Sequence, residues 1–234
     1  MMRSVACALI LGLASASPAQ AGAWLRSEGT GFVATSVAMN RSKDLSTSYY
    51  SEYGLSDTMT LGTDIYYGVD RTFFQQGSGI LFLRMPIGPT DQTHKFAAHF
   101  GLGARYLLGY FYPAAEVGLS WGRGIKWGER YGWVNVDTSY NKPLDDEPKD
   151  PYGSGYKPNA RVKLDATLGM GITENGKAMI QMFNTFEDGD TYTTLAPSFV
   201  FAPGGGDVSV QISAEFPVRG DGETSIKIGV WRTF

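Results

Sequence analysis

Apolar and polar residues alternate along most of the chain, in segments that short turn signals separate. In residues 161–172, every second residue from Val162 to Ile172 is apolar or small, whereas Lys163 and Asp165 fall on the opposite face. A period of two indicates β-strands, because successive side chains point to opposite faces of a sheet. Asn175-Gly176, which follows directly, is typical of a tight hairpin.

Twelve segments of this kind predict an all-β protein. An even number brings both ends of the chain to one side, as in a transmembrane, antiparallel, up-and-down β-barrel. Residues 42–55 alternate least clearly, so ten strands is the alternative. The predicted strands are 29–42, 47–55, 59–70, 77–88, 95–107, 112–124, 131–143, 160–172, 177–187, 191–203, 206–219 and 223–234.

The first 21 residues predict a secretory signal peptide. One early cation, Arg3, precedes an apolar stretch, and the small residues Ala19 and Ala21 form a cleavage signal. A lipoprotein that uses Cys7 is disfavoured, because too little apolar sequence precedes this cysteine. We therefore expect residues 22–234 to form one barrel domain without disulfides. No run of 18 apolar residues follows, so no spanning helix is predicted.

Charged residues fall on one face of the predicted strands. A charge on the lipid face near the midplane costs about 2 to 4 kcal/mol, so this face is expected to line the lumen. The inward glycines, among them Gly62, Gly101, Gly118 and Gly169, are expected to leave room there. The residues expected to line the lumen and contact a solute are Asp64, Arg84, His99, Arg105, Glu116, Lys163, Asp165, Glu215 and Lys227.

Aromatic residues are sorted between the two predicted ends of the barrel. All five tryptophans fall toward the end that holds the termini, and most tyrosines fall toward the other end. Amphipathic rings collect at membrane–water boundaries. The predicted membrane-interface anchors are Trp121, Trp127, Trp133, Trp231 and Phe234.

The last strand carries Ile226, Ile228, Val230 and a terminal Phe234 in alternation. This ending resembles the C-terminal signature of bacterial outer-membrane β-barrel proteins, although Arg232 stands where an apolar residue is usual. The resemblance implies an outer-membrane location, contact with lipid and lipopolysaccharide, and recognition of the last strand by the barrel-assembly machinery. "GAWLRSEGTGF", at residues 22–32, is similar to uncharacterised proteobacterial barrels grouped with aromatic-compound uptake.

A serine hydrolase is the third function that the sequence allows. Residues 118–122 match G-x-S-x-G, but a nucleophile elbow needs a helix after the serine, and none is predicted. His99 and Glu116 are expected near Ser120, inside the lumen. A polar belt in which Asp64 and His99 flank Arg84 is the favoured interpretation, because it would neutralise a buried arginine. We expect no enzymatic activity.

Other ligand classes find little support. A net charge of −3 without a basic stripe argues against nucleic acid as a partner. Two predicted outer loops are acidic, but they lack the ligand spacing of a calcium loop, so neither a metal nor a cofactor is expected. Their acidic residues are Asp145, Asp146, Glu147, Asp150, Glu187, Asp188 and Asp190.

The barrel is expected to form a narrow channel for small solutes. The charged lumen would set its selectivity. A closed structural or adhesive barrel, with residues 144–159 binding a ligand outside, is the alternative.

Overall fold

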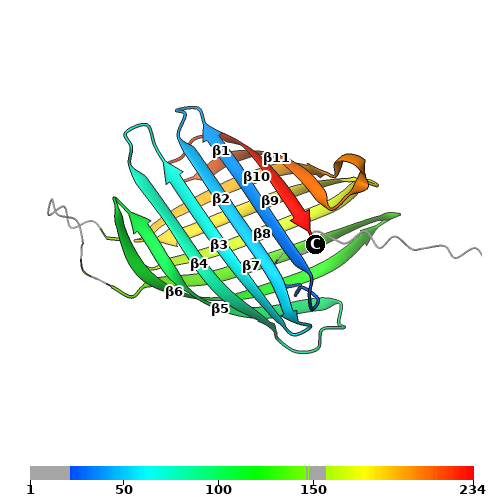
Figure 1. Cartoon of the computed structure of the whole chain (residues 1–234). Coiled ribbons are helices and arrows are strands. Elements are labelled where there is room, and N and C mark those ends of the chain that lie inside the picture. The colour runs from blue at the N-terminus through cyan, green and yellow to red at the C-terminus, as the bar shows by residue number, and fades with distance from the viewer. Residues whose placement is uncertain (1–21, 146, 148–156) are drawn as a thin grey trace, which may run out of the picture.

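The computed structural model describes residues 22–145, 147 and 157–234 as a closed antiparallel barrel (Figure 1). Twelve strands form it, and within the described residues no helix is long and apolar enough to cross a membrane. The strands are β1 (Gly31–Asn40), β2 (Leu45–Ser56), β3 (Met59–Val69), β4 (Gln75–Pro86), β5 (His94–Leu107), β6 (Tyr110–Trp127), β7 (Arg130–Pro143), β8 (Arg161–Thr173), β9 (Gly176–Glu187), β10 (Asp190–Phe201), β11 (Val208–Arg219) and β12 (Ser225–Thr233).

Each strand pairs with the next one along the chain, and β1 pairs with β12 to close the barrel. At the closure, Gly31 N donates to Phe234 O over 2.7 Å and Phe234 N donates to Gly31 O over 3.0 Å. The predicted twelve-strand barrel is confirmed. Residues 45–56, within the least clear part of the sequence, form the complete strand β2, so the ten-strand alternative is wrong.

The barrel has two different ends. At the terminal end, where β1 begins and β12 ends, most connections are short, although 87–93 and 202–207 are longer. At the opposite end, which we call the long-loop end, residues 144–160 connect β7 to β8. Part of that connection, including Asp146 and Asp150, lies outside the described residues. The β6–β7 hairpin extends beyond its neighbours at the terminal end (Figure 1).

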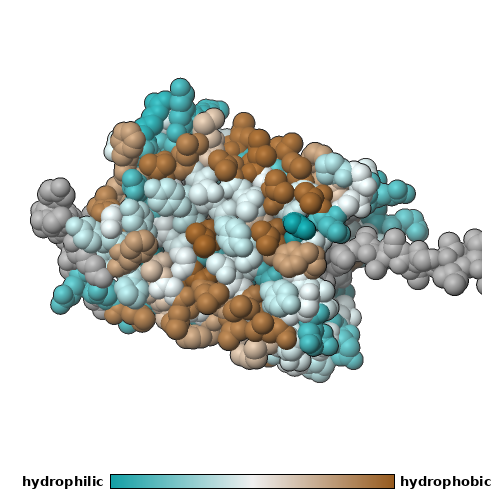
Figure 2. Space-filling model, in the orientation of Figure 1, coloured by the Kyte–Doolittle hydropathy of each residue, from teal (hydrophilic) through white to brown (hydrophobic). Residues whose placement is uncertain are grey.

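An apolar belt surrounds the wall. Figure 2 shows hydrophobic side chains over the middle of the strands and hydrophilic ones toward the two ends. Leu81, Val117 and Ile228 are each at least 50% exposed on this surface. Apolar side chains are normally buried in water-soluble proteins, so a large number of exposed ones over the middle of the strands is typical of a wall that faces lipid.

Candidate functional site

The barrel encloses a cavity of about 360 Å³ between its two ends. Its lining combines ionisable groups with rings such as Phe32, Phe183 and Trp231. Of the predicted lumen residues, Arg105 and Glu215 lie farther toward the long-loop end, where Glu215 Oε1 pairs with Lys227 Nζ. Those that line the cavity are Asp64, Arg84, His99, Glu116, Lys163, Asp165 and Lys227. Their contact with a solute stays a prediction.

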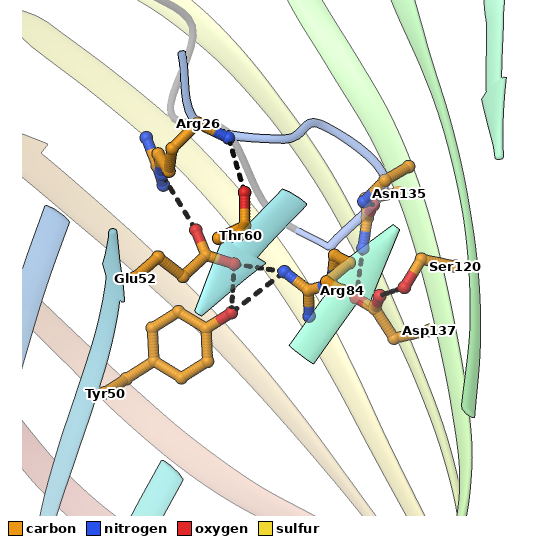
Figure 3. Close-up of polar contacts among 9 residues, drawn as sticks. Arg26, Tyr50, Glu52, Thr60, Arg84, Ser120, Asn135 and Asp137 are labelled. Atoms are coloured by element: carbon orange, nitrogen blue, oxygen red, sulfur yellow. Dashed lines mark hydrogen bonds and ion pairs between the residues drawn. The ribbon is translucent and has the colours of Figure 1, made fainter. Parts of the chain in front are cut away.

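Residues 22–30 enter the lumen and cross its terminal end; we call this segment the N-terminal plug. Ala23 N donates to Asn135 Oδ1 on β7 over 3.2 Å, and Arg26 N donates to Thr60 Oγ1 on β3 over 3.0 Å (Figure 3). The segment thus runs from β7 past β3 and continues into β1 at Gly31. Because β7 and β1 lie six positions apart in a ring of twelve strands, it passes from one side of the barrel to the other. The terminal mouth is therefore narrowed by the chain itself.

A buried ion-pair network fastens the N-terminal plug to the wall. Arg26 Nε lies 2.8 Å from Glu52 Oε2, and Arg84 Nη1 pairs with Glu52 Oε1. The Tyr50 hydroxyl donates to Glu52 Oε1 over 2.6 Å. The side chain of Glu52 is 0% exposed, and those of Arg26 and Arg84 are 7% and 6% exposed. We call Arg26, Glu52 and Arg84 the plug clamp (Figure 3).

The plug clamp corrects the predicted polar belt. Arg84 does lie opposite His99, but its partner on β3 is Thr60, whereas Asp64 pairs with Ile80. The carboxylate that neutralises Arg84 is therefore that of Glu52, and not that of Asp64 as predicted. Sequence reasoning missed Glu52 because the alternation of β2 is weak. Glu52 lies two residues after Tyr50 and therefore on the same, lumen-facing side of β2, and this spacing was the signal that could have identified it.

A second network narrows the long-loop end. Arg105 Nη2 lies 2.7 Å from Glu187 Oε1, and Arg161 Nε lies 2.8 Å from Glu187 Oε2. Arg105 Nη1 also donates to Asn159 O over 2.6 Å. Arg105 on β5 and Glu187 on β9 belong to strands four positions apart, so the pair reaches across the lumen. We call Arg105, Glu187 and Arg161 the loop-end clamp. Glu187, which the sequence placed among the acidic residues of an outer loop, is thus the last residue of β9 and forms ion pairs inside the barrel.

Two of the predicted membrane anchors lie inside the barrel. Trp133 is 2% exposed and packs with Met179 and Val200, and Trp24 and Trp231 contact this cluster. The predictions for Trp133 and Trp231 are therefore wrong. The alternation of residues already indicated that both side chains face the lumen. Trp133 lies four residues from the inward Asp137, and Trp231 lies four residues from the inward Lys227.

The other predicted anchors lie outside. Trp127 is 77% exposed and Phe234 is 57% exposed, both at the terminal end. Trp121 stacks on His94, with ring centroids 5.8 Å apart, and donates to His94 Nδ1 over 3.1 Å. Whether these rings anchor the chain at a membrane boundary stays a prediction.

The inward glycines do not leave an open path. A methyl group at Gly62 would come within 2.1 Å of the Phe82 ring, and one at Gly118 within 2.2 Å of the His99 ring. At Gly169 the neighbour is Trp133, also at 2.1 Å. Large side chains from adjacent strands thus fill the space above these glycines, and the room in the lumen lies elsewhere.

The serine and histidine considered for catalysis have other partners. Ser120 Oγ donates to Asp137 Oδ1 over 2.5 Å, and His99 Nε2 lies 3.3 Å from Glu116 Oε1. Across β5–β6, Ser120 pairs with Ala97, whereas His99 pairs with Gly118. Activation of a serine requires a hydrogen bond to its base, and among the described contacts none joins Ser120 to His99. Within residues 22–145, 147 and 157–234, no group of three His, Cys, Asp or Glu is placed to hold a metal ion.

Comparison with solved structures identifies the fold. An outer membrane channel from Pseudomonas putida F1 is similar, with a TM-score of 0.58 at 12% identity over 92% of this chain and 99% of that one. The chain therefore has the fold of bacterial outer-membrane β-barrels. The β domain of the Bordetella autotransporter BrkA is less similar in structure, with a TM-score of 0.48 at 14% identity over 88% of this chain and 99% of that one. Comparison with known protein families gives no match. Comparison with curated proteins gives none either.

Proposed function

We propose that the protein resides in the bacterial outer membrane and forms a narrow channel for small solutes. The single observation that supports this most is the ionisable cavity of about 360 Å³ inside a wall with an apolar outer belt. A wall of this kind is stable in lipid, whereas buried charges need water or partners around them. The similarity to an outer membrane channel supports the proposal at the level of the fold.

The two clamps set the size of the solute. Twelve strands about 4.8 Å apart and tilted by about 40° give a backbone cylinder of roughly 12 Å radius, and inward side chains occupy much of it. The plug clamp lies toward one end and the loop-end clamp toward the other. A solute that passes both must be small, and it meets carboxylates and cations on its way.

Ion selectivity in planar bilayers tests the proposal. The purified protein should conduct, and Arg105→Ala should shift the reversal potential toward cations, because it removes a positive charge at the loop-end clamp. Lys142→Ala is the matched control, since Lys142 is exposed and neighbours the inward Asn141 on β7. A membrane that stays silent, or an equal shift in both variants, would end the channel proposal.

A closed barrel with binding loops is the second candidate, and the N-terminal plug is the observation that favours it. If the N-terminal plug closes the terminal mouth completely, the lumen cannot conduct, and function would lie in residues 144–159 outside. This candidate predicts no conductance in any variant. It also predicts that shortening that loop abolishes binding to a partner while the barrel still assembles.

We also propose that the barrel-assembly machinery recognises β12 and that lipid and lipopolysaccharide surround the apolar belt. Ile226, Ile228 and Phe234 are each more than 55% exposed on one face of this strand end. Phe234→Ala should lower the amount of folded protein in the outer membrane, measured by heat-dependent gel mobility. An unchanged amount of folded protein would contradict recognition through Phe234.

A further inference from the structure

Asp137 is a carboxylate in the lumen whose hydrogen-bond donors are neutral. Ser120 Oγ donates to its Oδ1 over 2.5 Å, and Asn135 Nδ2 donates to its Oδ2. Within residues 22–145, 147 and 157–234, no ion pair joins Asp137 to a cation. Its partner across β7–β8 is Asp165, another carboxylate that lines the cavity. Like charges directly opposite each other destabilise a sheet, so the pair calls for a positive group.

The cationic side chains near Asp137 and Asp165 do not form ion pairs with these two carboxylates in the described part of the chain. Lys163 lines the same cavity, but in the described part of the chain it forms no ion pair with either carboxylate. Arg84 is held by Glu52 in the plug clamp, and Lys227 pairs with Glu215. The same part of the chain holds no metal-binding group. Arg84 acts on Asp137 only from a distance, through its charge, so a cation in direct contact with this carboxylate would have to come from another source.

The start of the N-terminal plug lies directly on Asp137. A methyl group at Gly22 would come 1.9 Å from Asp137 Oδ1 and 2.7 Å from its Oδ2. The φ angle of Gly22 is +48°, which favours glycine. The hydrogen bond from Ala23 N to Asn135 Oδ1 fixes the next residue in place. The backbone of Gly22 is thus packed against the carboxylate, with no room for a side chain.

The sequence predicts cleavage of the bond between Ala21 and Gly22. Hydrolysis by an envelope signal peptidase uses one water molecule, leaves a carboxylate on Ala21 and turns the amide nitrogen of Gly22 into an ammonium group. That nitrogen is one bond from the Cα that touches Asp137.

We propose that Asp137, with Asp165 beside it, is the binding site for the α-ammonium of Gly22. Removal of residues 1–21 creates the ligand, so processing of the precursor completes the seat of the N-terminal plug. In the precursor the same nitrogen is a neutral amide and cannot form the ion pair. The ion pair and the plug clamp then hold the first and the middle residue of the same segment, on β7 and on β2. The inference depends on cleavage after Ala21 and not on conduction.

The reactivity of the amine tests this site. The folded mature chain is treated with an acylating reagent at pH 8, and mass spectrometry quantifies the labelled tryptic peptide of residues 22–26. Only the neutral amine reacts, and an opposite charge within about 4 to 6 Å lowers its fraction by about tenfold or more. We therefore expect labelling at least about tenfold slower in the native chain than in Asp137→Asn. Because asparagine has the same shape as aspartate, steric protection would not produce this difference.

Two further chains complete the experiment. Asp207→Asn, which changes an exposed residue at the terminal end, should label as slowly as the native chain. If Asp137→Asn does not fold, a chain with one alanine added before Gly22 keeps Asp137 but moves the amine, and it should label rapidly. Equal labelling of the native chain and Asp137→Asn, or of the native and extended chains, would overturn the proposal. So would a mature chain that begins at a residue other than Gly22.

Discussion

The two ends of the lumen use the same chemical device in different surroundings. At the terminal end Glu52 lies between Arg26 and Arg84, and its side chain is 0% exposed. At the long-loop end Glu187 lies between Arg105 and Arg161, and its side chain is 20% exposed. The first carboxylate joins the N-terminal plug to the wall, whereas the second joins strands of the wall to one another.

The difference in burial decides what each clamp contributes. Removal of one partner from a buried pair leaves an uncompensated charge and costs about 3 to 5 kcal/mol, whereas an exposed pair contributes about 0 to 1 kcal/mol. Water can reach Glu187 and Arg161, whose side chains are each 20% exposed, so these two charges keep part of their hydration. The plug clamp should therefore control stability and closure, and the loop-end clamp should mainly tune selectivity.

The largest effect is expected for Glu52→Gln. Arg26 and Arg84 would face each other without the carboxylate between them, so the free energy of unfolding should fall by about 3 to 5 kcal/mol. The N-terminal plug should also loosen. Urea unfolding in lipid or detergent, followed by tryptophan fluorescence, measures the first effect, and protease digestion of residues 22–30 measures the second. An unchanged free energy of unfolding would show that the plug clamp does not stabilise the barrel.

A smaller effect is expected for Gly22→Ala. The added methyl group would collide with Asp137, and overpacking of this kind costs about 1 to 3 kcal/mol in addition to the strain of a positive φ. Gly29→Ala is the matched control, because Gly29 also has a positive φ but no atom within 4 Å of the added methyl group. Limited proteolysis should show a released plug in the first variant only; release in both would contradict the contact at Asp137.

The smallest effect on stability is expected for Glu187→Gln. Arg161 is 20% exposed and can be hydrated, and Arg105 keeps its hydrogen bond to Asn159 O, so the free energy of unfolding should fall by only about 1 kcal/mol. The reversal potential should shift toward anions, because the change removes a negative charge from the loop-end clamp. If Glu187→Gln destabilised the barrel as strongly as Glu52→Gln, the distinction between the two ends would be wrong.

The alternation of residues was sufficient to predict the barrel and its polar lumen, because both depend on a period of two within single strands. It also contained the inward position of Trp133, which a preference for aromatic rings at membrane boundaries obscured. Ion-pair partners on strands that are not adjacent in the barrel could not be predicted in this way. Arg105 meets Glu187 across four strands, and Arg26 reaches Glu52 from a segment that has no strand periodicity. Such contacts depend on closure and register, which no local pattern specifies.

Conductance with and without the N-terminal plug tests the central claim most directly. The intact mature chain and a chain that lacks residues 22–27 would be reconstituted in the same planar bilayers, with folding of both checked by circular dichroism. We expect a small conductance for the intact chain and a conductance several times larger for the shortened one. Equal conductance would contradict the closing role of residues 22–30, and silence in both would contradict the channel itself.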